Sequence, residues 1–221
     1  MGLKRALAAG VLGFAMTACA AGESGGVTDD GVTDNGAGVL HVAVVGDSLS
    51  FGNSTSFTAD GLGDESYVRW AFTDGIGLAG GTAVPGATSV QQAARVVPVD
   101  ADALVLALGT NDLAWGLPFE ETSGALARIA DTVGVPRVLL LSIPPLDYGQ
   151  EVDVAGFNRR LEALAAEQGW EYVDATAPVR EGDGWAPGMT TDGVHYTVAA
   201  ARAVGESLRE ALRAADSRDA R

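Results

Sequence analysis

Short apolar runs alternate with longer amphipathic stretches along most of this chain, and this alternation restricts its fold more than any other feature. Three of the runs are almost continuously apolar and end in Gly or Pro: 41–46 (HVAVVG), 103–109 (ALVLALG) and 137–145 (RVLLLSIPP). Runs of this kind are typical of strands that are buried on both faces. Two weaker candidates for strands are 80–84 (GGTAV) and 170–175 (WEYVDA).

Helical patterns fill the stretches between the strands, at 66–73, 89–95, 119–133, 152–168 and 197–214. Pro118 stands where a helix can begin, and Gly169 where one should end. Buried strands that alternate with helices predict an α/β fold, a three-layer α/β/α sandwich with a central parallel sheet. One domain over 39–214 accounts for the pattern, followed by a charged C-terminal tail at 215–221.

The N-terminal residues have the pattern of an export signal. Lys4 and Arg5 precede a ten-residue apolar run, 6–15, which is followed by small residues and by Cys19, the sole cysteine. These features predict a secretory signal peptide over 1–18. The apolar run is too short for a membrane-spanning helix, which requires ~20 residues. Cleavage there would leave the cysteine first. The arrangement resembles the lipobox of bacterial lipoproteins, which implies that Cys19 is lipidated; the alternative is an ordinary secreted protein with an incidental cysteine.

Residues 19–38 follow as a segment rich in Gly, Asp and Thr without any Lys or Arg. Such a composition cannot bury apolar surface, so we expect a flexible acidic linker after the lipidated Cys19. The chain would then be held at a membrane by its N-terminal lipid alone. We therefore expect an extracytoplasmic location, lipid-anchored to the cell membrane or otherwise secreted.

Charge and composition exclude several classes of function. The chain has 14 Lys and Arg against 29 Asp and Glu, a formal net charge of −15, and this balance repels nucleic acid. One cysteine excludes an intrachain disulfide, and the two distant histidines, His41 and His195, make a poor metal ligand set. A flavodoxin-like cofactor binder would need a phosphate loop, but the turn at 46–50 is short and has no Lys. We expect no metal and no cofactor.

Polar turns follow the predicted strands. In open parallel sheets, ligands bind beyond the carboxyl ends of the strands, and the turns after successive strands meet at that edge. The turns concerned are 46–50 (GDSLS), 85–89 (PGATS) and 109–112 (GTND). A fourth, 192–195 (DGVH), follows the last weak strand and precedes the final helix, so we expect it at the same edge.

These turns contain the groups of a nucleophilic hydrolase. A serine needs a base to take its proton, and a histidine held by a carboxylate is the usual solution. Ser48 would be the nucleophile and His195 the base, and Asp192, three residues earlier, could reach the imidazole. A tetrahedral intermediate also needs hydrogen-bond donors for its oxyanion, and the candidates are the backbone N–H groups of Ser48 and Gly86 and the side-chain amide of Asn111.

Many residues near these turns can have a structural role and not a catalytic one. We expect the carboxylates of Asp47 and Asp112 to bond to their own turns, as Asp often does. His41 lies inside the first strand, toward its far end, and is expected to be a structural histidine. The nearby aromatic residues could line a substrate pocket or simply pack in the protein, and both readings stay open: Trp115, Trp185 and Tyr196.

In this order along the chain, GDSLS, Gly86, GTND and DGVH resemble the four signature blocks of the SGNH/GDSL hydrolase family, over essentially the whole domain. The resemblance implies a flavodoxin-like α/β/α sandwich and an esterase or lipase that needs no cofactor. It also implies that Ser48 is the nucleophile and first oxyanion donor. Gly86 and Asn111 match the other two donors, and Asp192 and His195 complete the triad.

The predicted function is that of an exported serine esterase that cleaves carboxylic esters through an acyl-enzyme. The loops of the domain are short and leave little material for a lid over a long acyl chain. Short-chain acyl esters or O-acetylated sugars are therefore favoured as small-molecule substrates. The alternative is a non-catalytic ester- or glycan-binding lipoprotein on the same scaffold. The sequence does not define the oligomeric state.

Overall fold

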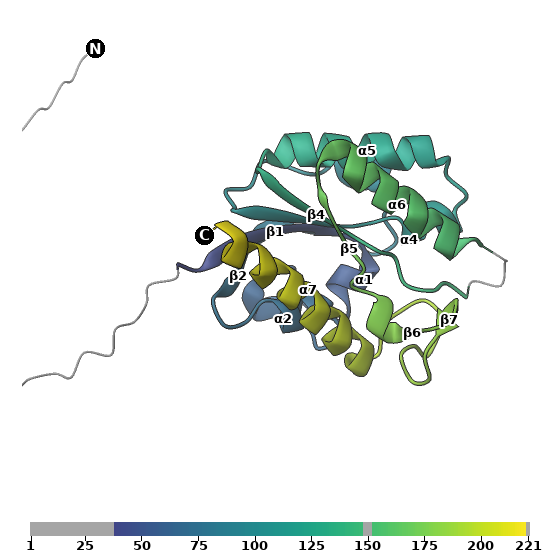
Figure 1. Ribbon diagram of the computed structural model, residues 1–221. Coiled ribbons are helices and arrows are strands. Elements are labelled where there is room, and N and C mark those ends of the chain that lie inside the picture. The colour runs from purple at the N-terminus through teal and green to yellow at the C-terminus, as the bar shows by residue number, and fades with distance from the viewer. Residues whose placement is uncertain (1–37, 148–151, 220–221) are drawn as a thin grey trace, which may run out of the picture. The chain divides into compact units, whose positions relative to one another are not determined.

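A computed structural model describes residues 38–147 and 152–219 of the chain (Figure 1). The predicted signal peptide, Cys19 and the linker as far as residue 37 lie outside the described residues. The central sheet has five strands, all parallel, in the order β2-β1-β3-β4-β5. The strands are β1 (Leu40–Gly46), β2 (Ile76–Ala83), β3 (Ala103–Ala107), β4 (Arg137–Leu141) and β5 (Glu171–Val173). The predicted parallel sheet is confirmed, and its strand order is that of flavodoxin-like folds.

Each predicted helical stretch contains a helix, and two short helices were not predicted. The helices are α1 (Ser48–Phe51), α2 (Tyr67–Ala71), α3 (Ser89–Ala93), α4 (Thr110–Ala114), α5 (Phe119–Val133), α6 (Val154–Gln168) and α7 (Val198–Asp219). Single 3₁₀ turns lie at Ala59–Gly61 and Ala177–Val179, and a small hairpin consists of β6 (Arg180–Glu181) and β7 (Gly184–Trp185). Helix α7 continues beyond the predicted end at Ala214, because the stretch up to Asp219 has no Gly or Pro to stop it.

The alternation of side chains along the strands divides the core into two layers. One set of strand side chains packs against α2 and α7, and the other set packs against α5 and α6 (Figure 1). In β1, Val42 and Val44 belong to the first layer, whereas Ala43 and Val45 belong to the second. Because β1 is covered on both faces, it reads as a continuous apolar run. The three-layer sandwich is therefore confirmed.

The ends of the long helices follow local rules of capping. Helix α5 begins after Pro118 and ends at Gly134, which has a left-handed backbone. Helix α6 is capped at its start by Asp153, whose side chain accepts from the N–H of Gly156, and at its end by Gly169, again left-handed. None of the described helices is both long enough and apolar enough to cross a bilayer.

The direction in which successive strands are added to the sheet reverses between β1 and β3. From β1 the chain passes to β2 on one side, and then crosses over to β3 on the other side of β1. Ligand sites of doubly wound sheets lie at this switch point, beyond the carboxyl ends of the strands. The turns that follow β1, β2 and β3 are those that contain Ser48, Gly86 and Asn111.

Candidate active site

Ser48 lies at the carboxyl end of β1, as the first residue of the short helix α1. Asp47 caps this helix, and its Oδ1 accepts from the backbone N–H of Leu49 at 3.0 Å. Asp47 is therefore bonded to its own turn, as the sequence predicts, while Ser48 stays partly exposed. The cap fixes the direction in which the serine leaves the strand.

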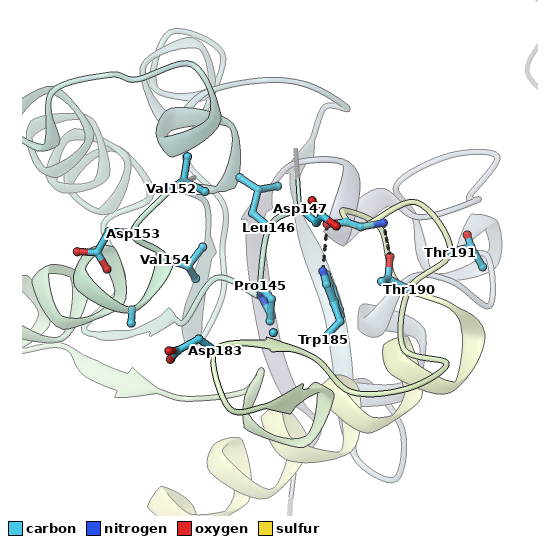
Figure 2. A pocket seen from close by; sticks show the side chains of 13 residues that line it. Pro145, Leu146, Asp147, Val152, Asp153, Val154, Asp183, Trp185, Thr190 and Thr191 are labelled. Atoms are coloured by element: carbon cyan, nitrogen blue, oxygen red, sulfur yellow. Dashed lines mark hydrogen bonds between the residues drawn. The ribbon is translucent and has the colours of Figure 1, made fainter. Parts of the chain in front are cut away.

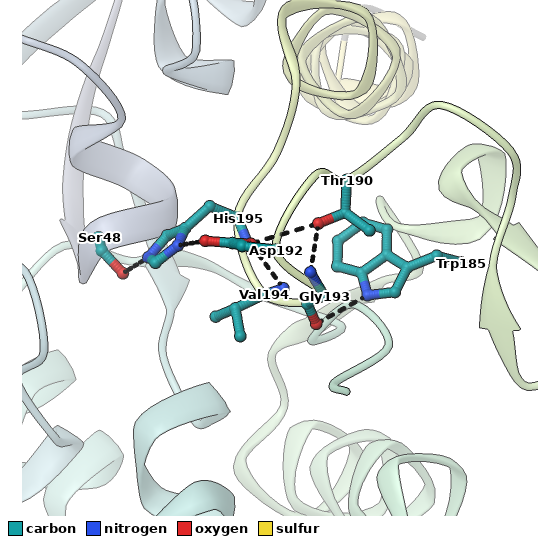
Figure 3. Close-up of polar contacts among 7 residues, drawn as sticks. All are labelled: Ser48, Trp185, Thr190, Asp192, Gly193, Val194 and His195. Carbon is teal, nitrogen blue, oxygen red and sulfur yellow. Dashed lines mark hydrogen bonds and ion pairs between the residues drawn. The ribbon is translucent and has the colours of Figure 1, made fainter. Parts of the chain in front are cut away.

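The structure brings Ser48, His195 and Asp192 together in one hydrogen-bonded line (Figure 3). His195 Nε2 lies 3.0 Å from Ser48 Oγ, and its other ring nitrogen, Nδ1, lies 2.7 Å from Asp192 Oδ2. A ring held in this way donates from Nδ1 to the carboxylate and leaves Nε2 free to accept the serine proton. The arrangement can therefore activate a serine hydroxyl.

The second oxygen of Asp192 is bound by the backbone of the same loop. Its Oδ1 accepts from the N–H of Val194 at 2.9 Å and from the N–H of His195 at 2.7 Å. Partial burial raises the pKa of Asp192, but the hydrogen bonds from His195 and Val194 outweigh it, and the pKa lies well below the ordinary 3.8. Asp192 is thus a stable anion beside the imidazole.

Gly193, between Asp192 and His195, is held by three hydrogen bonds. Its N–H donates to Thr190 Oγ1 at 3.0 Å, and its carbonyl accepts from the N–H of Asp147 at 2.8 Å and from the indole N–H of Trp185 at 3.0 Å. Its φ is +79°, and a side chain here would lie 2.8 Å from the Cβ of Asp147. Only glycine fits without strain. No sequence pattern pointed to the bonds from Thr190, Asp147 and Trp185, because their partner is a backbone group.

Gly86 occupies a tight turn after β2. The N–H of Ala87 bonds to the carbonyl of Val84 at 3.1 Å, with Pro85 and Gly86 (φ +74°) at the two central positions. This is a type II turn, which requires a positive φ at its third residue. Within the described residues, no hydrogen bond engages the N–H of Gly86 or that of Ser48. Both groups are free to donate to a ligand.

Asn111, the third predicted donor, lies on α4 with both of its amide hydrogens in use. Its Nδ2 donates to Asp47 Oδ2 at 3.1 Å and to the carbonyl of Ala87 at 3.0 Å. The side chain is therefore held between the turn of Ser48 and the turn of Gly86. Any further acceptor must replace one of these two partners, since the NH₂ group has only two hydrogens.

Two buried carboxylates support these turns. Burial raises the pKa of Asp47 from 3.8 to about 7, although the N–H of Leu49 lowers it, and Asp112 raises it further. The prediction for Asp112 was wrong: its carboxylate does not bond to its own turn but accepts from the N–H and hydroxyl of Ser89 and from the hydroxyl of Thr122. It joins α3, α4 and α5. Such distant partners cannot be read from local sequence.

The cavity at the serine is small. About 230 Å³ of space is lined by Ser48 and His195 together with Leu49, Gly52, Glu65, Pro85 and Tyr196. Glu65 is partly buried in this wall, and its carboxylate has no hydrogen-bond or ion-pair partner among the described residues. An ester bound at Ser48 therefore meets a short pocket with one acidic group.

A larger cavity of about 990 Å³ borders the loop at 190–193 (Figure 2). Trp185, Asp183, Asp147 and Thr190 are among the residues that line it. It has Gly193 in its wall, so it adjoins the loop that carries Asp192 and His195.

The open question about the aromatic residues has different answers for different residues. Tyr196 is buried and packs edge to face against Trp185, with ring centroids 6.0 Å apart, and it also lines the cavity at Ser48. Trp185 both packs and lines the larger cavity, whereas Trp115 is exposed. His41 lies near the opposite end of β1, where its Nδ1 is 3.6 Å from Asp102, and it takes no part in the site.

A parallel α/β/α sandwich with a serine, a histidine and a carboxylate in contact beyond its strands has the form of a hydrolase. Residues 44–203 match the model of the GDSL-like Lipase/Acylhydrolase family. The chain belongs to this family and is an ester-hydrolysing enzyme.

Solved structures of similar proteins agree with the fold. A GDSL-like lipase from Bacteroides thetaiotaomicron is 22% identical, with a TM-score of 0.60 over 79% of this chain and 88% of its own. TesA is 26% identical, with a TM-score of 0.59 over 78% of this chain and 98% of its own. A catalytic mutant of an acetylxylan esterase from Geobacillus stearothermophilus is 18% identical, with a TM-score of 0.58 over 78% and 94%. A search of curated protein sequences finds no match.

Proposed function

We propose that this chain is an exported serine esterase that uses Ser48, His195 and Asp192 as its catalytic triad. The observation that carries the proposal is the line of contacts from Ser48 Oγ to His195 Nε2 at 3.0 Å and from His195 Nδ1 to Asp192 at 2.7 Å. Ester hydrolysis is the chemistry of the family, and these are the polar contacts that such a reaction requires.

In the first half of the reaction, Ser48 Oγ attacks the carbonyl carbon of the ester while His195 Nε2 takes the serine proton. Asp192 stabilises the imidazolium that forms. When the tetrahedral intermediate collapses, the bond to the alcohol oxygen breaks, and that oxygen takes the proton from His195. The acyl group stays on Ser48 as an ester. In the second half, His195 takes a proton from water as the water oxygen attacks this ester. The bond from the acyl carbon to Ser48 Oγ then breaks, Oγ takes the proton back from His195, and the carboxylic acid leaves.

The oxyanion would be bound by the free N–H groups of Ser48 and Gly86. For Asn111 to be the third donor, one hydrogen must turn from the carbonyl of Ala87 to the oxyanion. The bond to Asp47 is the one to keep, because a carboxylate is the stronger acceptor. The negative charge of the intermediate supplies the competing acceptor, so this contact would form as the reaction proceeds.

The small cavity at Ser48 favours short acyl groups. Its volume of about 230 Å³ leaves little room for a long acyl chain. We propose short-chain esters or O-acetyl groups on sugars as substrates, without a cofactor. We also propose export by the signal peptide at 1–18 and attachment to a membrane by a lipid on Cys19, which gives the domain an extracytoplasmic location.

Hydrolysis of p-nitrophenyl esters by the full chain tests the proposal. Wild type is assayed against chain lengths from acetate to palmitate, beside Ser48→Ala. We expect turnover that falls with chain length and that drops more than about a thousandfold in Ser48→Ala. Asp60→Asn, an exposed carboxylate that bonds to none of these residues in the described part of the chain, is the control.

Two results would contradict the proposal. Turnover that persists in a folded Ser48→Ala variant would remove the serine from the mechanism. An absence of turnover on every ester by folded wild type would favour the alternative, a binding lipoprotein on the same scaffold.

A further inference from the structure

An exposed tryptophan stands next to the candidate oxyanion site. Among the described residues, the large apolar side chains that remain exposed are Val39, Val97, Trp115 and Val198. Trp115 is 68% exposed, and it is the C-cap residue that follows helix α4. Its N–H bonds to the carbonyl of Asn111 at 2.9 Å, so the same helical turn fixes the tryptophan and the candidate donor.

Trp115 forms one side of a groove of about 430 Å³, which has the size of a small-molecule site. We call it the Trp115 groove. Its other walls come from Gly86, Thr88, Val90, Gln91, Leu117 and Glu121. Pro85, one residue before Gly86, lines the cavity of Ser48 and His195. The groove and the catalytic cavity thus meet at the same turn.

The polar groups of the groove define what it can hold. Gln91 uses its side-chain oxygen to accept from the N–H of Thr88, but its side-chain nitrogen has no partner within the described residues. The carboxylate of Glu121 has none there either, since the neighbouring Glu120 is the one that pairs with Arg160. The groove therefore offers an aromatic face, a free donor and a free acceptor.

We propose that the Trp115 groove binds a neutral sugar ring, adjacent in an oligosaccharide to the ring whose acyl group is cleaved at Ser48. A sugar ring has an apolar C–H face that can lie on an indole and a rim of hydroxyl groups that can bond to Gln91 and Glu121. This inference rests on the proposed esterase function and names its substrate class, an O-acylated oligosaccharide.

Other occupants fit the groove less well. An acyl chain would cover the Gln91 amide and the Glu121 carboxylate without bonding to either, and burying unpaired polar groups costs free energy. An anionic ligand would meet Glu121 and the net charge of −15 of the chain. A neutral ring with hydroxyl groups satisfies both the aromatic face and the polar rim.

Comparison of one-ring and four-ring substrates tests the inference. The full chain is assayed on O-acetylated methyl glycosides and on O-acetylated tetrasaccharides of three series: xylose, glucose and N-acetylglucosamine. In at least one series, we expect wild type to have a kcat/KM about tenfold higher for the tetrasaccharide, mainly through a lower KM. Trp115→Ala should bring this ratio close to one, and Trp115→Phe should restore most of it. Val97→Ala, another exposed apolar side chain, should leave the ratio unchanged.

Several outcomes would overturn the inference. One is a ratio near one for wild type in all three series. Another is a Trp115→Ala variant that keeps the ratio but loses activity on longer p-nitrophenyl esters, which would assign the groove to the acyl chain.

Failure of the esterase proposal is recognised separately. Binding of the unacetylated tetrasaccharides to Ser48→Ala is measured by calorimetry, with and without Trp115→Ala. Loss of binding on removal of the indole supports the sugar subsite whether or not wild type hydrolyses p-nitrophenyl acetate. Absence of binding in every series argues against it.

Discussion

At the scale of single residues, Asn111 depends on Asp47 for its orientation. Asp47 is fully buried behind the serine, and its two oxygens accept from Leu49 and from Asn111. A carboxylate suits this position because it has acceptors only. The turn that holds Ser48 and the side chain of Asn111 therefore share one buried carboxylate, although they follow different strands, β1 and β3.

Replacement of Asp47 by Asn should uncouple the two residues. The new amide can still accept from Leu49, but its NH₂ group would face the NH₂ group of Asn111, and two donors cannot bond. We expect kcat for p-nitrophenyl acetate to fall about tenfold to a hundredfold, less than the 10²–10³ typical of losing an oxyanion donor outright, with little change in KM. Steady-state kinetics of Asp47→Asn beside Asp60→Asn measure the effect, and an unchanged kcat would show that Asn111 needs no such partner.

At the scale of elements, the loop at 190–195 is tied to the rest of the site through backbone groups. Asp147, from the segment after β4, and Trp185, from β7, both donate to the carbonyl of Gly193. These two segments thus help to determine where the histidine lies relative to Ser48. The hairpin of β6 and β7 contributes to the position of this loop through the indole N–H of Trp185.

Trp185→Phe removes this N–H and keeps an aromatic ring against Tyr196. A neutral hydrogen bond contributes about 1 kcal/mol, so we expect a loss of roughly fivefold in kcat, with KM for p-nitrophenyl acetate little changed. Trp170→Phe, in the core layer of α5 and α6, is the matched control. If both variants lose the same activity, the indole bond of Trp185 has no specific role in positioning the loop.

Some elements and contacts could be predicted from the sequence and others could not. Strands β1, β3 and β4 were predictable because they lie in almost continuously apolar runs that end in Gly or Pro. Helices α5 and α6 were predictable because each is long enough to show a helical period and is followed by Gly. Helices α1 and α4 are too short for any period. The residue types of the site were visible in the turns, since such turns meet at one edge of a parallel sheet. The bonds of Gly193 and the second partner of Asn111 were not visible, because they join backbone groups and segments far apart in the chain.

At the scale of the whole molecule, the buried Asp47 makes stability depend on pH. In the unfolded chain this carboxyl ionises near 3.8, whereas burial raises its folded pKa to about 7. As the pH rises, the unfolded state therefore loses its proton first. The contribution of Asp47 to stability is complete below about pH 4 and is lost by about pH 7. Asp192, whose folded pKa is lowered, has the opposite effect and destabilises the fold only as the pH falls below its ordinary range.

Denaturant unfolding between pH 4 and pH 8 tests this dependence. We expect the free energy of unfolding of wild type, measured relative to Asp47→Asn, to decrease from about pH 4 to about pH 7 and then to level off. The comparison uses the slope with pH and not the absolute stability, because the substitution also breaks the bond to Asn111. Asp60→Asn should follow wild type. Parallel curves for wild type and Asp47→Asn would mean that Asp47 ionises alike in both states.

The amino and carboxyl ends of the strands differ in what lies beside them. The described chain begins at Gly38, beside the amino end of β1, where the N–H of Leu40 donates to the carbonyl of Gly75. The final helix, α7, lies at the same end, because the side chain of Arg213 donates to the carbonyl of Asp74. Ser48 lies at the other end of the seven residues of β1, roughly 20 Å away at about 3.3 Å per residue. A tether or fusion partner joined ahead of Gly38 would therefore be attached near the amino ends of the strands, at the end of β1 that is farther from Ser48.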